Sequence, residues 1–139
     1  MKQKFFIPGK LPGANDITKA NRSHWSIGSK QKKDVQKLIC WHIKKAKLKP
    51  MKQIYIKYFW FEPNKKRDLD NITAAQKFIN DSLVEMRIIE NDGWDFVKGL
   101  WHHFEIKKDK ESIGVFVELD DEPKSAMAFD YSVEEFFTA

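Results

Sequence analysis

The segment QIYIKYFWF, at residues 53–61, sets the strongest limit on how this chain can fold. It is dense in β-branched and aromatic residues, and Lys57 is its only charged residue. Such a composition favours a β-strand that is covered on both faces, because water on either face would meet large apolar side chains. We therefore expect this segment to be the central strand of a sheet.

Three shorter segments are expected to provide the other strands. KFFI, at residues 4–7, reads as a short strand. Alternating segments at roughly 96–107 and 112–119 are separated by the charged turn KKDKES. Two alternating runs joined by a short polar turn look like a β-hairpin. We therefore expect the last two strands to pair with each other.

Helical periodicity indicates two main helices. Apolar residues recur at helical spacing after Ser29 and stop before Pro50, and a second set runs over residues 71–86 with Asp70 as its natural N-cap. The stretch IPGKLPGAND, at residues 7–16, contains two Pro-Gly pairs and is expected to be a turn-rich loop. The predicted fold class is therefore α+β, with a small mixed sheet packed against two main helices.

Length and composition indicate one compact body. At 139 residues, with 42% hydrophobic residues, the chain is long enough for one core and short for two. Its single cysteine, Cys40, excludes an intramolecular disulfide and a thiolate-rich zinc site. No apolar run approaches the roughly 18 residues of a membrane-spanning helix. We expect a soluble, cytoplasmic protein with no membrane partner.

Charge is distributed unevenly along the chain. Residues 1–50 hold thirteen Lys and Arg against two acids, a net charge of +11. Residues 120–139 hold six acids against one lysine, a net charge of −5, which leaves +10 on residues 1–119. Concentrated positive charge is typical of proteins that bind a polyanion, nucleic acid above all. The predicted division is a domain over 1–119 and an acidic, aromatic extension over 120–139.

Two closely spaced carboxylates are the chain's clearest chemical signal. Asp68 and Asp70 stand two apart, directly after three basic residues at 65–67. If an extended backbone continues through Leu69, both carboxylates project to one side at the start of a helix. Crowded like charges need a compensating cation, and Mg²⁺ prefers oxygen ligands. We therefore expect a divalent-metal site, with Asp92 in the loop after the helix as the third ligand.

The helix that follows carries further charges on the same face. On a helical wheel Asp70, Lys77 and Asp81 fall within about 40° of one another, opposite the apolar side chains. They would share a face that is clear of the helix's packing surface. The alternative is that Asp70 only caps the helix and the remaining charges form surface ion pairs.

These residues together resemble one known family. The chain resembles the RusA family of Holliday junction resolvases, of the phage or prophage type, in three features. These are RDLDN, then a helix with Lys77 and Asp81 four apart, then Asn91-Asp92 before a strand, where the family has an acidic pair. The resemblance extends over about residues 4–119, but only 67–92 is specific. The family's two motif aspartates match Asp68 and Asp70, its helical lysine matches Lys77 and its last acidic residue matches Asp92. Lys77 lies further from Asp70 than the family's lysine does.

The resemblance implies a Mg²⁺-dependent endodeoxyribonuclease that resolves four-way DNA junctions by paired nicks in recombination and repair. The three aspartates would hold one or two Mg²⁺ ions, with Mn²⁺ as a substitute, and Lys77 would orient water or stabilise the transition state. Asn71 and Asp81 are candidate supporting residues. A homodimer is also implied, because a nearly two-fold symmetric junction asks for two active sites.

Basic side chains on the first long helix and before the aspartates are expected to contact phosphates, which gives shape recognition and a steep salt dependence. They are Lys30, Lys32, Lys33, Lys37, Lys44, Lys65, Lys66 and Arg67. For the helix lysines the alternative is a plain solvated face. Trp25, Trp41 or Phe61 could wedge at the branch point, although each is also a natural core residue.

Several alternatives stay open at the level of sequence. One is a nuclease that prefers flaps or forks, and another is a non-catalytic DNA-binding protein whose aspartates are only structural. His102 and His103 face opposite sides of an alternating strand, so we expect no shared metal there. The extension over 120–139 is expected to dock on this chain or on a partner, and its charge suggests an autoinhibitor that mimics DNA.

Overall fold

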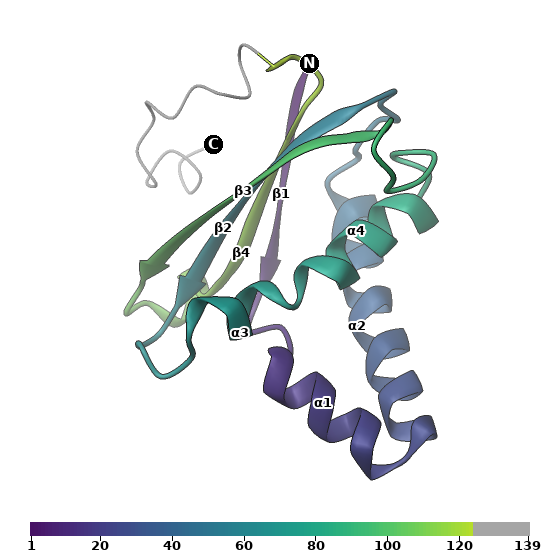
Figure 1. Ribbon diagram of the computed structural model, residues 1–139. Coiled ribbons are helices and arrows are strands. Elements are labelled where there is room, and N and C mark those ends of the chain that lie inside the picture. Colours follow the sequence, from purple (N-terminus) through teal and green to yellow (C-terminus); the bar gives the residue numbers. More distant parts are fainter. Residues whose placement is uncertain (124–139) are drawn as a thin grey trace.

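A four-stranded mixed sheet forms one layer of the molecule (Figure 1). The computed structural model describes residues 1–123. The strands are β1 (Lys2–Pro8), β2 (Ile54–Glu62), β3 (Val97–Ile106) and β4 (Gly114–Asp120). Their order in the sheet is β1-β4-β2-β3, with β2 parallel to β3 and the other pairs antiparallel. The predicted α+β class and the central position of β2 are confirmed.

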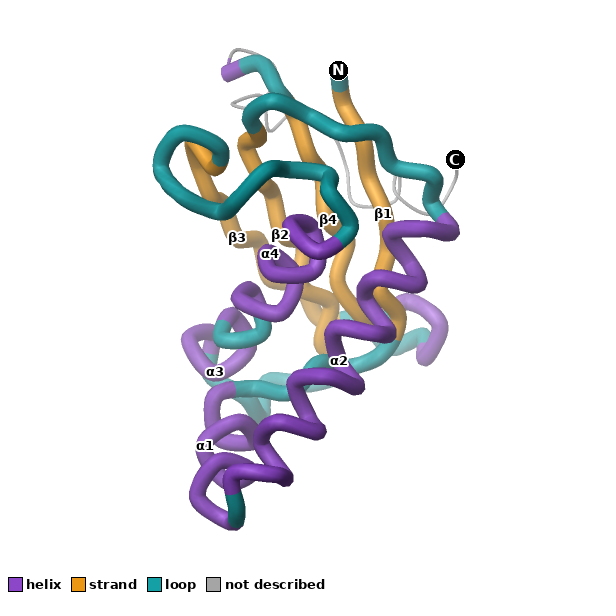
Figure 2. The backbone as a smooth tube through the Cα atoms, turned by 90° about the vertical axis from the view of Figure 1, so that its right-hand side faces the viewer, coloured by secondary structure: helices purple, strands orange, loops and turns teal. Residues whose placement is uncertain are grey.

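The helices form a second layer on one face of this sheet, as both views show (Figures 1 and 2). They are α1 (Ala14–Ser23), α2 (Trp25–Lys45), α3 (Leu69–Thr73) and α4 (Gln76–Glu85), and a 3₁₀ turn at Lys110–Ser112 leads into β4. Within residues 1–123 no helix combines the length and the apolar character needed to cross a membrane.

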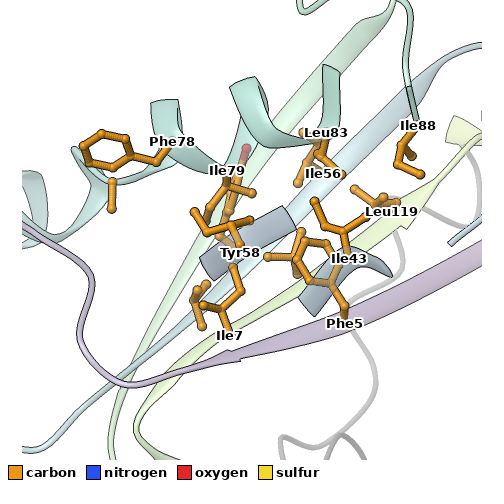
Figure 3. Packing of buried hydrophobic residues seen from close by; sticks show 14 of the residues in the cluster. Phe5, Ile7, Ile43, Ile56, Tyr58, Phe78, Ile79, Leu83, Ile88 and Leu119 are labelled. Carbon is orange, nitrogen blue, oxygen red and sulfur yellow. The ribbon is translucent and has the colours of Figure 1, made fainter. Parts of the chain in front are cut away.

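The main core lies between the two layers (Figure 3). Ile56 and Tyr58 of β2 meet Ile79 and Leu83 of α4, and Ile43 joins them from α2; all five are at most 1% exposed. Burial of such side chains contributes about 1.5–3 kcal/mol each. The two helices and the sheet are therefore held in a fixed relation by one continuous apolar cluster.

The other face of β2 is also buried. Phe59 and Phe61 point away from the helices and form a second cluster with Phe116 of β4, against which Phe6 packs. The expectation that water is kept from both faces of this strand therefore agrees with the structure.

The predicted hairpin of the last two strands is wrong. β3 and β4 are antiparallel, but β2 lies between them and pairs with both. The connection passes the end of β2, where the Lys107 N–H donates to the Glu62 carbonyl at 2.9 Å. Alternation identified the two strands correctly, but strand pairing depends on contacts from distant parts of the chain, which alternation does not report.

The predicted helix over 71–86 consists of two helices. Ala75 N–H donates to the Ile72 carbonyl, and Phe78 N–H to the Ala75 carbonyl, both over three residues rather than four. Such bonds tighten the backbone and mark the end of one helix and the start of the next. The N-cap is Asp68 rather than Asp70, and Leu69 is already helical, so the extended backbone expected through Leu69 is absent.

A helix also replaces part of the expected turn-rich loop. α1 begins at Ala14 after the N-cap Gly13, whose N–H donates to the Asp16 carboxylate at 2.9 Å. A carboxylate three residues after the cap satisfies one of the backbone donors that a helix start leaves free.

The boundary placed between residues 119 and 120 cuts into the sheet. Asp120 is the last residue of β4 and pairs in register with Lys2. Residues 124–139, which hold most of the expected acidic extension, lie outside the described residues.

Candidate active site

Asp68 and Asp70 lie at the start of α3, where the chain returns from β2 to the helical layer. Asp68 has extended backbone angles and its carbonyl accepts the Ile72 N–H at 3.1 Å, which closes the first turn. Both carboxylates are exposed, and within residues 1–123 neither side chain has a hydrogen-bond or ion-pair partner. Two carboxylates two residues apart are thus presented to solvent.

Lys77, the second residue of α4, is held between two carboxylates. Its ammonium lies 2.9 Å from Asp81, one turn further along α4, and 3.0 Å from Asp92 in the loop before β3. Hydrogen bonds to Asp81 and then to Asp92 raise the pKa of Lys77, so it stays protonated at neutral pH. The structure thus brings Lys77, Asp81 and Asp92 together near the start of α4. The sequence had singled out all three.

Asp81 also links α4 to α2. Its carboxylate accepts a hydrogen bond from Gln36 at 3.4 Å, and the ammonium of Lys32 lies 3.9 Å away. Lys32, expected to contact DNA, therefore lies on the side of α2 that meets the candidate site. The contacts with Gln36 and Lys32 join the Asp81 carboxylate, which pairs with Lys77, to α2.

Arg67 joins three separate parts of the chain. Its guanidinium forms two hydrogen bonds with Glu62 at the end of β2, at 2.9 and 2.8 Å, and a third with the Leu11 carbonyl at 2.9 Å. Its side chain is only 14% exposed. The sequence grouped Arg67 with the cations that contact phosphate, whereas here it orients the segment that carries Asp68.

Asn71 connects α3 to the start of α1. Its side-chain oxygen accepts the backbone N–H of Asn15 at 3.1 Å. Gly13 lies so close that a Cβ at that position would be 2.4 Å from the same oxygen and 3.0 Å from Arg67. Asn71 therefore joins α3 to α1, and its expected support of a metal site stays a prediction. Gly13 is a residue that sequence reasoning missed, although its Pro-Gly pair was visible.

The three aspartates do not form a ready-made metal cage. Across residues 1–123 no group of three or more His, Cys, Asp or Glu side chains lies close enough to hold a metal ion. Asp92 is bound to Lys77 instead. Mg²⁺, however, is usually held by one or two protein carboxylates together with substrate phosphates. The free carboxylates of Asp68 and Asp70 have the donor chemistry for such a site, whereas Asp92 in this position does not complete it.

Most of the lysines expected to contact DNA are exposed. Lys33, Lys37 and Lys44 lie exposed along α2, and Lys65 and Lys66 lie exposed just before Asp68. Lys30, also on α2, lies 3.4 Å from Asp34, one helical turn away. These side chains give α2 and the β2–α3 connection a positively charged surface.

Of the three aromatic wedge candidates, the structure removes Phe61. Its side chain is fully buried in the sheet, whereas Trp25 and Trp41 of α2 are 77% and 55% exposed. Within residues 1–123 the most exposed aromatic side chain is that of Trp94, at 95%. Trp94 lies in the same loop as Asp92 and was not singled out from the sequence. Its position in the DGW turn after the predicted ligand was the signal that could have identified it.

His102 and His103 lie on opposite faces of β3, as expected. The His102 ring stacks on Tyr58 of the main core, and its Nδ1 accepts the indole N–H of Trp60 at 2.9 Å. His103 instead approaches Phe59 on the other face. Neither ring points to a site shared with the other.

Searches against family models and against curated proteins found no match for this chain.

Proposed function

We propose that the chain is a Mg²⁺-dependent endonuclease that cuts branched DNA, with the four-way junction as its main substrate and a homodimer as its working form. The observation that most supports this is the contact of Lys77 with Asp92. These two residues are 15 positions apart, and their ion pair lies at the α3–α4 junction, just after the free carboxylates of Asp68 and Asp70. The family resemblance in the sequence singled out the same four residues.

Each side chain would have a separate task. Asp68 and Asp70 would hold the metal ion, which when bound supplies charge stabilisation and a more acidic water at the scissile phosphate. Lys77 would act as a fixed cation rather than as a base, because its raised pKa keeps it protonated. Asp92 and Asp81 would hold the Lys77 ammonium in place, and the exposed lysines of α2 would bind the flanking phosphates.

One observation favours a rival. Within residues 1–123 there is no cluster of three carboxylates. A non-catalytic DNA-binding protein whose aspartates are only structural would not need such a cluster either. In that case replacing a carboxylate would leave function intact or strengthen DNA binding, since it removes a negative charge.

The deciding experiment is cleavage of a labelled four-way junction, beside linear duplex, flap and fork substrates, with and without Mg²⁺. We expect paired nicks in the junction that need Mg²⁺. Asp70→Asn should abolish them while junction binding is retained. Asp109→Asn, at an exposed aspartate between β3 and β4, is the matched control and should cut normally. Binding without cleavage under any divalent metal would favour the non-catalytic rival, and faster cutting of flaps or forks would change the assigned substrate.

A further inference from the structure

A cavity of about 360 Å³ opens beside Asp68. It lies where the carboxyl ends of the parallel strands β2 and β3 face the start of α3, and Glu62, Asp68 and Ile106 all border it. Ligands of open α/β sheets commonly bind at the carboxyl ends of parallel strands. Its volume is within the range of small-molecule sites. The cavity is adjacent to the candidate active site without containing the Lys77 ion pairs.

One wall of the cavity is apolar and partly open to solvent. Leu69 and Ile106 border it with exposed fractions of 55% and 40%, and Ile72 and Phe104 form the deeper surface. Single exposed aliphatic side chains are ordinary, but two that face one hollow indicate a surface that is covered when a ligand binds. The wall suits a flat ligand with apolar faces.

The other residues that line the cavity are polar or charged, and Glu105 is among them. Arg67 and Glu62 are fixed by their paired hydrogen bonds, and the Asn64 side chain accepts the Lys66 N–H at 3.0 Å, which orders the connecting loop. The exposed Lys65 stands at the rim beside Asp68. A ligand with polar edges and an attached phosphate would find donors, acceptors and a cation there.

We propose that this cavity receives one unpaired nucleobase of the bound DNA, with the adjoining phosphate at Lys65. This proposal rests on the proposed function and extends it to the basis of substrate choice. A base has apolar faces for Leu69 and Ile106 and polar edges for the polar residues of the lining. Taking a base out of a duplex costs unstacking and unpairing energy, and this cost is least where a base is already unpaired. The cavity therefore favours branched DNA over linear duplex.

Binding without metal tests this separately from cleavage. A four-way junction with 2-aminopurine at the branch point is titrated with protein in a chelator, and linear duplex is titrated in parallel. Leu69→Ala and Ile106→Ala remove the exposed wall, and Leu69→Trp fills the cavity. Leu100→Ala is the matched control, because Leu100 is 41% exposed on β3 and does not line the cavity.

We expect the wild-type protein to change the 2-aminopurine fluorescence, and the wall variants to weaken junction binding about tenfold with duplex binding unchanged, which is the scale of one lost base-stacking contact. The cavity proposal would be overturned if the wall variants bound the junction as tightly as Leu100→Ala does. It would also be overturned if the wild type bound the junction without changing the 2-aminopurine fluorescence. If the wild type cuts junctions while the wall variants bind normally, the cavity proposal alone fails. If the wall variants behave as expected but the wild type never cuts, the proposed nuclease function alone fails.

Discussion

Arg67 makes contacts that the sequence did not predict. Its place in the run Lys65–Arg67 suggested a phosphate contact, yet it bonds to Glu62 and to the Leu11 carbonyl. A run of cations does not show which of its members will pair with a buried carboxylate. The partners of Arg67 are distant in the fold or in the chain, because Glu62 is on β2 and Leu11 is near the N-terminus. Lys65 and Lys66, without such partners, keep the expected exposure.

We expect Arg67→Ala to lower the free energy of unfolding by about 3–5 kcal/mol, because Glu62 is 6% exposed and would keep a buried charge without its partner. Arg67→Lys should restore little, since an ammonium cannot form the paired hydrogen bonds. Urea denaturation measures the change. Lys66→Ala, an exposed neighbour, is the control and should stay within about 0.5 kcal/mol of the wild type. An Arg67→Ala variant as stable as Lys66→Ala would contradict this role.

His102 should make the fold sensitive to acid. Burial lowers its pKa, and its Nδ1 accepts the Trp60 N–H, so a proton added there would oppose that donor. The unfolded chain, with a histidine pKa near 6.5, then binds a proton at higher pH than the folded chain does. Stability is therefore full above about pH 6.5 and falls as the pH decreases below it.

His102→Phe should accordingly lose less stability than the wild type between neutral pH and about pH 5. Part of the dependence of stability on pH should remain, because burial also lowers the pKa of His42. Denaturation curves at several pH values provide the measurement, with His103→Phe on the other face of β3 as control. Equal pH slopes for His102→Phe and the wild type would show that this ring is not the group responsible.

At the scale of elements, the sequence predicted strands more reliably than the boundaries of helices. β2 was identified because its aromatic and β-branched residues allow no other buried structure, whereas the break at Ala74–Ala75 contains no glycine or proline to mark it. The first three residues of α1, Ala14–Asp16, were assigned to a loop because Pro12 and Gly13 precede them. The carboxylate of Asp16 three residues after Gly13 was the available signal.

Lys77 connects two elements, and this connection can be tested without a substrate. Lys77→Met removes the ammonium that joins α4 to the Asp92 loop, so backbone amides at residues 91–95 should exchange with solvent faster. Overall stability should change by less than about 1 kcal/mol, because Lys77 is 70% exposed and exposed ion pairs contribute little.

Hydrogen exchange followed by mass spectrometry makes this measurement. Lys30→Met is the matched control, because Lys30 also pairs with an aspartate one helical turn away, and within residues 1–123 that is its only ion pair. Exchange at residues 91–95 should be unchanged in that variant. The same exchange rates in Lys77→Met and the wild type would mean that the loop is held by other contacts, such as the bonds from Phe96 and Val97 to the Gly93 carbonyl.

At the scale of the whole molecule, one contact of the candidate site follows from local sequence spacing, and another depends on the complete fold. The spacing of Lys77 and Asp81 was sufficient to predict their ion pair, because four residues make about one helical turn. The family resemblance placed Lys77 and Asp92 in one site, but the direct ion pair between them, in place of a metal at Asp92, was not foreseen. Contacts that close a loop onto a helix depend on the whole fold, which a single sequence does not report.

Charge is also a property of the whole molecule, and it predicts the effect of the C-terminal segment. Residues 1–119 carry +10 and residues 120–139 carry −5. If the acidic segment competes with DNA for the basic surface of α2, its removal should raise DNA affinity and make binding more dependent on salt, because more counterions are then displaced by the phosphates. The deletion should begin at Lys124, since Asp120 belongs to β4. It then removes three acids and one lysine, a net charge of −2 out of the −5.

The experiment compares the full chain, a deletion of residues 124–139, and a charge-neutral variant that combines Asp130→Asn, Glu134→Gln and Glu135→Gln. The neutral variant keeps the length and the aromatic residues, so it separates the effect of charge from that of packing. Junction affinity is measured over a series of salt concentrations. We expect both changes to strengthen binding at low salt and the three proteins to converge as salt screens the charges. Tighter binding by the deletion alone would assign the effect to packing, and identical salt dependence in all three would end the autoinhibition hypothesis.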